Sequence, residues 1–424
     1  MAMIRPEIEM KDSGVQWLGN IPKEWGVGKV KHEFYATKTI VGDKVNDYER
    51  LALTLNGVIK RSKDAGDGLQ PDKFDGYQIL KEHELVFKLI DLANVSTSRV
   101  GLSPYTGIVS PAYIVLHYRK DMNPRYGEYY FLSMWMNEVF NHIGGDGVRS
   151  ALNAKDLLNI PYLKVSPDEQ QAIADYLDET CSKIDEIIAE AKASIDEYKE
   201  LKQSVIFEAV TKGLNKNVDM KQCSVNWLDE IPSTWESIRL KYLLTEINNR
   251  SETGTEQPLS VSQVMGVVPS YMIAVANPTA SYVGQKIVEP NDIVFNKLKA
   301  HLGVFFMSKY HGLVSPDYAV YRTNDKVIPK YVEYLFHTSA CISEFKKYIS
   351  GVAEGLMRLY TSDLFNIRIC LPKVDEQIKI VEYVENKVEL FNSLIAEKES
   401  LINDLEAYRK SLIYEVVTGK RRVV

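Results

Sequence analysis

The sequence has few of the features that mark secreted or membrane proteins. Its 424 residues contain only four cysteines and no CxxC pair, so neither a disulfide framework nor a zinc site is expected. It has no run of about 18 apolar residues, and its opening MAMIRPEIEMKDSG lacks the apolar stretch of a signal peptide. We therefore expect a cytoplasmic protein with free thiols at Cys181, Cys223, Cys341 and Cys370.

The motifs of common enzyme classes are also missing. There is no GxxxxGK[ST] phosphate-binding loop, no GxGxxG after a strand, and no HExxH or similar spacing among the seven histidines. NPRY at 123–126 lacks the second proline of the Asn-Pro-Pro-aromatic motif of amino-methyltransferases, and no glycine-rich cofactor loop precedes it. QPDKFDG at 70–76 is typical of a turn and not of a nuclease site. We therefore predict no catalytic residue, no bound metal and no cofactor in this chain.

What the sequence does contain is an internal repeat. A chain of 424 residues is too long for one ordinary core, so two or more domains are expected. The repeated segments lie 205–210 positions apart, in the same order: WLGNIPKEW (17–25) and WLDEIPSTW (227–235), GIVSPAY (107–113) and GLVSPDY (312–318), KDLLNI (155–160) and SDLFNI (362–367), DEQ (168–170) and DEQ (375–377). This period far exceeds the 20–50 residues of solenoid repeats, so a duplicated set of domains is predicted.

Each half begins with a block of mixed helix and strand pattern. Short runs of Val, Phe and Tyr such as YIVLHY (113–118) and NDIVFNKL (291–298) are bounded by Gly, Pro, Asn and Asp, as strands are. Helical spacing follows near 126–140 and 330–348. We predict two α+β domains, at 1–160 (with an N-terminal framework segment at 10–26) and at 221–370.

Each block is followed by the pattern of one long helix, at 165–213 and 373–420. The first has Ser166 as N-cap, Pro167 at the first helical position, Glu169 as the partner of a capping box and Gly213 as a stop. Apolar residues recur at steps of three and four, which is a coiled-coil seam. The seam residues are Cys181, Ile184, Ile188, Ala191, Ile195, Tyr198 and Val205 in the first helix, and Phe391, Ile395, Ile402, Leu405 and Leu412 in the second. The two helices are expected to pack on each other, although each seam would also suit a partner protein.

The net charge of −6 is unevenly distributed. The helical segments 165–212 and 374–420 hold 5 basic against 12 acidic residues and 6 against 10. The blocks 26–150 and 236–362 hold 16 against 15 and 13 against 11. The acidic helices are expected to avoid phosphate, whereas the α+β blocks can present a local basic face.

Four stretches together resemble the specificity subunits of type I restriction–modification systems. They are MKDSGVQWLGNIPKEW with its repeat, IPYLKVSPDEQQAIADYLD, IRICLPKVDEQIKIVEYVE and LKQSVIFEAVTKG, and the resemblance spans nearly the whole chain. It implies two target-recognition domains, each of which reads one half of a split, asymmetric DNA site. It also implies that the two helices pack antiparallel and set the spacer between the half-sites.

The resemblance implies partners as well. Such a subunit does no chemistry, and it binds two modification subunits that use S-adenosylmethionine and two restriction subunits that use ATP and Mg²⁺. The sequence between the repeated flanks differs between the halves, as in ALTLNGVIKRSKDAGDG against PLSVSQVMGVVPSYMIA. This difference favours two unlike half-sites.

Candidate DNA contacts are basic or amide residues in the loops of each block, since these side chains suit phosphates and base edges. They are Lys60, Arg61, Lys63, Lys88, Arg99 and Arg149 in the first block, and Asn296, Lys297, Lys299, His301 and Arg358 in the second.

The repeated tryptophan segment is the candidate framework or partner interface, although it could equally pack on its own domain. Its residues are Trp17, Ile21, Pro22 and Trp25, repeated as Trp227, Ile231, Pro232 and Trp235. The seam residues Ile184, Ile188, Ile195, Phe391, Ile395 and Ile402 belong to the same framework.

Two other functions stay open from sequence alone. One is a coiled-coil scaffold with two protein-binding domains, which the acidic helices and the lack of a strong basic stripe would suit. The other is a standalone methyltransferase or nuclease, against which the missing cofactor loop counts.

Overall fold

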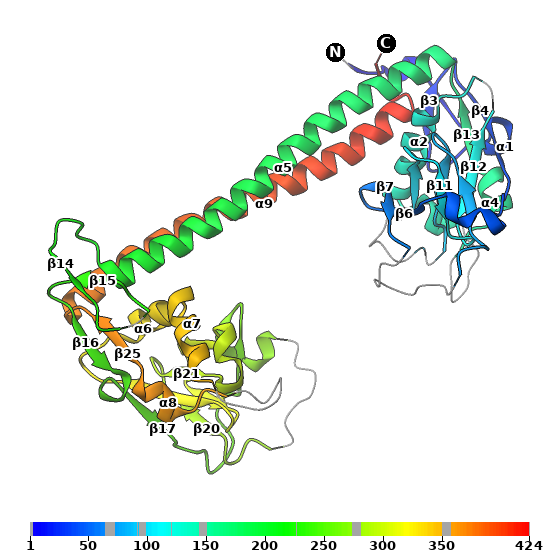
Figure 1. The fold of residues 1–424 in the computed structure, drawn as a ribbon. Helices are drawn as coiled ribbons and strands as arrows, with labels where there is room; N and C mark the ends of the chain where they lie inside the picture. The colour runs from blue at the N-terminus through cyan, green and yellow to red at the C-terminus, as the bar shows by residue number, and fades with distance from the viewer. Residues whose placement is uncertain are drawn as a thin grey trace. The chain divides into compact units, whose positions relative to one another are not determined.

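The computed structural model describes residues 3–63, 73–90, 92, 99–119, 121–143, 151–225, 227–273, 281–349 and 358–423. The chain divides into two units, which we call unit 1 (Met1–Ala191 with Ser400–Val424) and unit 2 (Lys192–Glu399). Each unit contains one α+β domain and opposite ends of two long helices, α5 (Pro167–Lys212) and α9 (Val374–Val417) (Figure 1). The predicted fold class, α+β with two long coiled-coil helices, is confirmed.

The two long helices pack on each other within each unit. In unit 1, Ile184 and Ile188 of α5 are buried in the same cluster as Ile402 of α9, and Asp185 forms an ion pair with Arg409. In unit 2, the ring centroids of Tyr198 and Phe391 lie 6.4 Å apart, and Lys202 Nζ donates to Asn392 Oδ1 at 3.0 Å. Because the N-terminal part of α5 meets the C-terminal part of α9, the helices are antiparallel.

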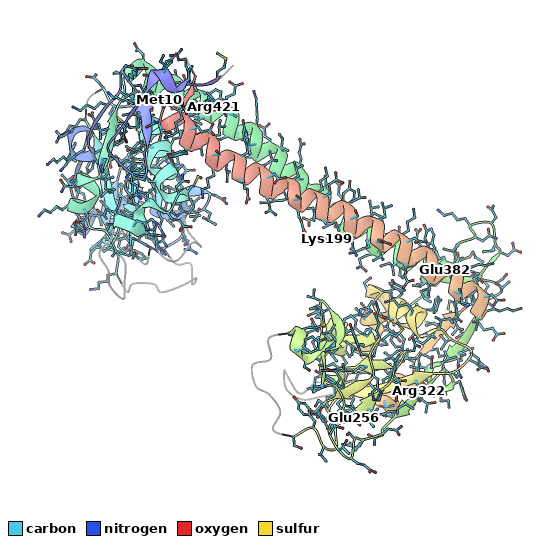
Figure 2. All side chains as sticks on the ribbon, turned by 180° about the vertical axis from the view of Figure 1, so that it is seen from behind. Met10, Lys199, Glu256, Arg322, Glu382 and Arg421 are labelled. Atoms are coloured by element: carbon cyan, nitrogen blue, oxygen red, sulfur yellow. The ribbon has the colours of Figure 1, made fainter. Side chains whose placement is uncertain are left out.

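The remaining faces of α5 and α9 are mostly polar, with single exposed apolar residues such as Leu201 and Leu390. Lys199 and Glu382 are exposed on the outside of the pair, as Figure 2 shows. Ala191 and Ile195 on the inside of α5 are buried, whereas Ile395 of α9 stays partly exposed. Among the described residues no helix is both long and apolar enough to span a membrane.

The domain of unit 1 contains two four-stranded sheets. The first has the order β10–β9–β12–β5 with every pair antiparallel, and the second has the order β7–β6–β11–β8 with β11 parallel to β6. Their strands are β5 (Phe34–Ala36), β6 (Arg50–Thr54), β7 (Gly57–Arg61), β8 (Gln78–Leu80), β9 (Leu85–Phe87), β10 (Val100–Leu102), β11 (Gly107–Val109) and β12 (Ile114–Tyr118). Helix α2 (Pro124–Met136) places Phe131 with its ring centroid 4.9 Å from that of Phe87, so the helix packs on the first sheet.

The domain of unit 2 repeats this arrangement. Its main sheet has the order β17–β24–β21–β22. Two antiparallel pairs, β18–β19 and β20–β23, are joined by a parallel bridge between Pro258 and Leu313. The strands are β17 (Leu244–Ile247), β18 (Leu259–Ser262), β19 (Gly266–Pro269), β20 (Lys286–Val288), β21 (Ile293–Phe295), β22 (Phe305–Met307), β23 (Gly312–Val314) and β24 (Ala319–Thr323). The strand order matches that of unit 1 element by element, which confirms the tandem repeat.

Shorter elements complete both units. The helices are α1 (Val30–Glu33), α3 (Val139–Ile143), α4 (Ala154–Asn159), α6 (Pro329–Phe336), α7 (Ser339–Lys347) and α8 (Thr361–Asn366), with 3-10 turns η1 (Glu7–Glu9), η2 (Gly42–Asp47), η3 (Leu240–Tyr242), η4 (Ser270–Met272) and η5 (Lys297–Leu302). The paired strands are β1 (Met3–Ile4) with β26 (Arg421–Arg422), β2 (Met10–Asp12) with β3 (Asn20–Pro22), β4 (Gly26–Lys29) with β13 (Pro161–Lys164), β14 (Met220–Gln222) with β15 (Glu230–Pro232), and β16 (Glu236–Arg239) with β25 (Arg368–Leu371).

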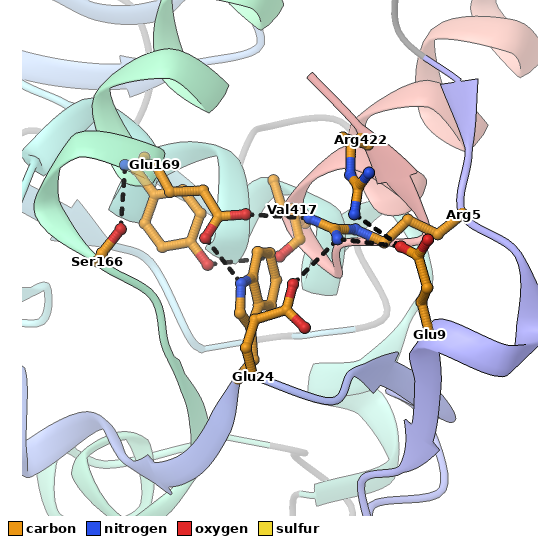
Figure 3. Close-up of polar contacts among 9 residues, drawn as sticks. Arg5, Glu9, Glu24, Ser166, Glu169, Val417 and Arg422 are labelled. Atoms are coloured by element: carbon orange, nitrogen blue, oxygen red, sulfur yellow. Dashed lines mark hydrogen bonds and ion pairs between the residues drawn. The ribbon is translucent and has the colours of Figure 1, made fainter. Parts of the chain in front are cut away.

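The repeated tryptophan segment of unit 1 packs on both long helices. Trp25 Nε1 donates to Glu169 Oε2 at the start of α5 at 2.9 Å. At the end of α9, the hydroxyl of Tyr414 donates to the carbonyl of Trp17 at 3.2 Å. Figure 3 shows the polar contacts around Glu169, including buried Arg5, whose guanidinium lies 3.2 Å from the Glu169 carboxylate.

Unit 2 builds the same joint from its own copy. Trp235 is fully buried, and its Nε1 donates to Glu376 Oε1 at the start of α9 at 3.3 Å. Tyr331 donates to the carbonyl of Val210 near the end of α5 at 2.8 Å, as Tyr126 does to Val417 in unit 1. The segment therefore packs on its own domain and also joins two helix ends within each unit.

The repeated DEQ motif supplies two of these contacts. Its glutamates, Glu169 and Glu376, accept from the tryptophans. Its glutamines, Gln170 and Gln377, are buried, and each accepts a backbone N–H at 2.9 Å, from Asn123 and from Ile328. The sequence shows only that the DEQ motif is repeated. In the structure, each copy of the motif joins an α+β domain to the start of a long helix.

The other framework residues lie in the same two clusters. Ile21 and Ile231 are buried, while Trp17 and Trp227 are partly buried against the cores of their units. Pro22 and Pro232 end β3 and β15 and are buried.

Candidate nucleic-acid interface

The candidates of unit 2 lie in one turn at the end of strand β21. Asn296 caps the turn η5, because its Oδ1 accepts from the backbone N–H of Leu298 at 3.1 Å and of Lys299 at 3.2 Å. Lys299 is exposed, and Lys297 and His301 are half-buried. Asn296 is therefore a positioning residue that holds the lysines in place.

Arg358 joins the same turn from a distant part of the sequence. The N–H of the next residue, Leu359, donates to the carbonyl of Lys297 at 3.1 Å. The structure thus places Asn296, Lys297, Lys299 and His301 on one turn and brings the backbone next to Arg358 against it.

A buried lysine that the sequence did not single out lies near this turn. Lys286 Nζ donates to the carbonyl of Tyr318 at 2.8 Å. Burial lowers the pKa of Lys286, and the charges of Lys297 and Arg250 lower it further, whereas Glu246, 3.7 Å away, opposes them. This side of unit 2 therefore concentrates positive charge.

In unit 1, the described residues that flank the end of strand β9 make equivalent backbone bonds. The N–H of Lys88 donates to the carbonyl of Arg99 at 3.0 Å, as that of Asn296 donates to Val304 at 2.9 Å in unit 2. The N–H of Leu152 donates to the carbonyl of Leu89 at 2.9 Å, in the place of the bond between Leu359 and Lys297. The same backbone frame therefore carries Lys88 in unit 1 and Asn296 in unit 2.

Arg99 has a different position from the one expected of a DNA contact. It is only 1% exposed, and its Nη1 donates to the carbonyls of Ile90 at 3.1 Å and Lys88 at 3.4 Å. We remove it from the candidate contacts, because its guanidinium is used to hold the turn. Arg149 lies outside the described residues.

The other candidates of unit 1 lie on or beside the hairpin β6–β7. Lys60 Nζ is 2.6 Å from Glu49 Oε2, and this hydrogen bond raises the pKa of Lys60. Lys63 Nζ donates to the carbonyl of Val45 at 2.6 Å. Arg61 is exposed and lies directly opposite Arg50 across the hairpin, an arrangement that sequence reasoning missed because strand register cannot be read from composition.

In the part of the chain that the structure describes, no group of three or more His, Cys, Asp or Glu side chains is placed to hold a metal ion. The candidate site is therefore made of cationic, amide and apolar side chains on turns.

A family model matches part of the chain. Residues 232–404 match the model of the type I restriction modification DNA specificity domain. This range contains most of the α+β domain of unit 2 and much of α9. The resemblance predicted from the sequence is confirmed.

Solved structures extend the likeness to nearly the whole chain. One is a chain from a study of complex assembly and conformational transition in the type I restriction–modification system, with a TM-score of 0.71 and 14% identity over 94% of this chain and 99% of that one. Another is the HsdS subunit from Thermoanaerobacter tengcongensis, with a TM-score of 0.54 and 14% identity over 94% of this chain and 98% of that one. At this identity the likeness shows a common fold. A search of curated proteins gives no match.

Proposed function

We propose that the chain is the DNA-recognition subunit of a type I restriction–modification complex and that each α+β domain reads one half of a bipartite, asymmetric target. The observation that carries this proposal is the pair of equivalent sets of backbone hydrogen bonds directly after β9 and β21. The residues that make them differ, with Lys88 and Leu89 in the places of Asn296 and Lys297. The two backbone arrangements are the same but carry different side chains. This suits two different half-sites, since bases are distinguished by the side chains that contact their edges.

The charge distribution supports the same division of labour. Sequence-specific binding needs cations for phosphates and other groups for base edges. Lys297 and Lys299 lie on one turn of unit 2, and Arg358 precedes the residue that is bonded to this turn, whereas α5 and α9 are acidic. The α+β domains would therefore contact DNA, and the helices would not.

The long helices suit a role in spacing and docking. They contain 46 and 44 residues, so each is about 65–70 Å long. We propose that their length sets the spacer between half-sites. Exposed apolar side chains on them, including Leu201 and Leu390, suit contact with two modification subunits. Two restriction subunits would join the assembled complex.

Catalysis in this proposal belongs to the partners. The modification subunits would bind S-adenosylmethionine, and the restriction subunits would use ATP and Mg²⁺, in the cytoplasm. A coiled-coil scaffold with two protein-binding domains is the alternative function, and it predicts no sequence preference on DNA.

Methylation mapping tests the proposal as a whole. We expect cells that carry this gene with its neighbouring modification gene to methylate adenine in one split target with two different halves. Sequencing of modified bases in genomic DNA would show both halves and the gap. A palindromic target would contradict the proposal that the two domains recognise different half-sites. If no methylation depends on this gene, the proposed function is wrong.

Replacing Lys297 and Lys299 by alanine tests the turn of unit 2. We expect the assembled complex to bind DNA roughly 10-fold more weakly at moderate salt, with a salt slope reduced by about 2, since two phosphate contacts are removed. Lys309→Ala with Lys326→Ala is the matched control, because these exposed lysines carry the same charge in the same unit outside the turn. Equal affinities for both double variants in a titration followed by fluorescence anisotropy would show that the turn does not contact DNA.

A further inference from the structure

The hairpins β6–β7 and β18–β19 occupy equivalent places in the two units and have turns of similar construction. In unit 1, the hydroxyl of Thr54 accepts from the N–H of Asn56 at 3.2 Å and donates to the carbonyl of Gly57 at 3.0 Å. In unit 2, the hydroxyl of Ser262 accepts from the N–H groups of Val264 and Met265, both at 3.2 Å. A side-chain hydroxyl thus holds each turn in one conformation. The direction of the side chain at the tip is therefore fixed before any ligand binds.

The side chains at both tips are apolar and exposed. Leu55 is 58% exposed, Val264 is 92% exposed and Met265 is 48% exposed. Single exposed apolar residues are common on protein surfaces. Here, however, both tips carry one although the two hairpin sequences differ, as LTLNG against VSQVMG shows.

Cationic groups flank both hairpins. In unit 1, Arg50 and Arg61 lie opposite each other at the end of the hairpin away from its tip. In unit 2, Gln263 Nε2 donates to the carbonyl of Leu302 at 3.2 Å and so holds the tip against the turn that carries Lys297 and Lys299.

We propose that these two hairpins are the elements that enter the major groove of DNA and that Leu55 and Val264 contact base edges there. The inference rests on the proposed function and names the reading elements of that function. A two-stranded ribbon fits the major groove, where the methyl group of thymine is an apolar feature that an aliphatic side chain can contact. The flanking cations complement phosphates, so DNA is the occupant and not an apolar protein surface.

The test uses the complex assembled with its modification subunits and a pool of duplexes of random sequence. Sequencing the bound duplexes gives the base preference of each half-site for the wild type, Leu55→Ser and Val264→Ser. We expect Leu55→Ser to lower the preference in one half-site roughly 10-fold and Val264→Ser to do so only in the other, with unchanged binding to the pool as a whole. Ile8→Ser is the control, since Ile8 is an aliphatic residue 80% exposed outside the hairpins.

The outcomes separate this inference from the function on which it rests. If the wild type selects a split sequence and both hairpin variants select it equally well, the hairpins are not the reading elements, and the proposed function stands. If the hairpin variants bind all duplexes more weakly to the same extent, the tips contact the DNA backbone and not the bases. This result would also overturn the inference. If the wild type selects no sequence, both proposals fail.

Discussion

Trp235→Ala is expected to lower the free energy of unfolding of unit 2 by about 3–5 kcal/mol, since large-to-small changes of a buried tryptophan create a cavity. Trp235 is fully buried where β15 and the start of α9 meet, and it also donates to Glu376. Trp25→Ala is expected to have the same effect on unit 1, through Glu169. Hydrogen exchange followed by mass spectrometry measures the two units separately.

Two variants separate the causes of this loss. Trp235→Phe keeps most of the packing but removes the hydrogen bond to Glu376, so it should cost about 1–3 kcal/mol. Trp227→Ala lies in the same repeated segment but changes a side chain that is only partly buried, and it should cost less than Trp235→Ala. Native exchange rates in Trp235→Ala would show that the segment does not hold unit 2 together.

Gly419→Ala is expected to destabilise unit 1 by about 2–4 kcal/mol, more than the equivalent Gly213→Ala destabilises unit 2. Both glycines follow the end of a long helix with positive φ, +72° and +74°. A Cβ on Gly419 would lie 2.4 Å from Pro22 Cγ and 2.9 Å from Trp25 Cη2. A Cβ on Gly213 would lie 3.0 Å from the carboxylate of Glu376 and 3.3 Å from Trp235 Cζ2, which is less crowded.

Gly14→Ala is the control for the cost of placing a non-glycine residue at positive φ. Gly14 has φ +69° in unit 1, and a Cβ there would meet no atom within 4 Å, so only the cost of the left-handed conformation of about 1–2 kcal/mol remains. Chemical denaturation followed by tryptophan fluorescence measures all three variants. If Gly419→Ala lowers the free energy of unfolding no more than Gly14→Ala does, the prediction is wrong, and the contacts of a Cβ with Pro22 and Trp25 cost nothing.

The long helices could be predicted because their signals are local, and the repeat because matching segments recur 205–210 positions apart in the same order. Ser166 and Gly213 mark the ends of the first helix, and the observed α5 begins at Pro167 and ends at Lys212. The seam follows from a period of three and four residues. The fold class therefore needed only local patterns and the comparison of the two halves of the sequence.

The details of the candidate site depend on contacts between distant residues and could not be predicted. Arg99 was expected at the surface, where most arginines lie, but the carbonyls of Lys88 and Ile90 converge on it. The pairing of Arg50 with Arg61 depends on strand register, and the place of Arg358 depends on the bond from the next residue, Leu359, to Lys297. Likewise, the repeat marked DEQ as shared but did not show which groups its side chains contact.

The division of the chain has a consequence for its synthesis. Unit 2 is one continuous stretch, whereas the core of unit 1 includes Leu412, Ile413, Val416 and Val417, which are synthesised after the whole of unit 2. Domains usually fold as they emerge from the ribosome, beginning with the N-terminal one. Here the α+β domain of unit 1 is made before unit 2 but keeps part of its apolar surface uncovered until the C-terminal part of α9 has been synthesised.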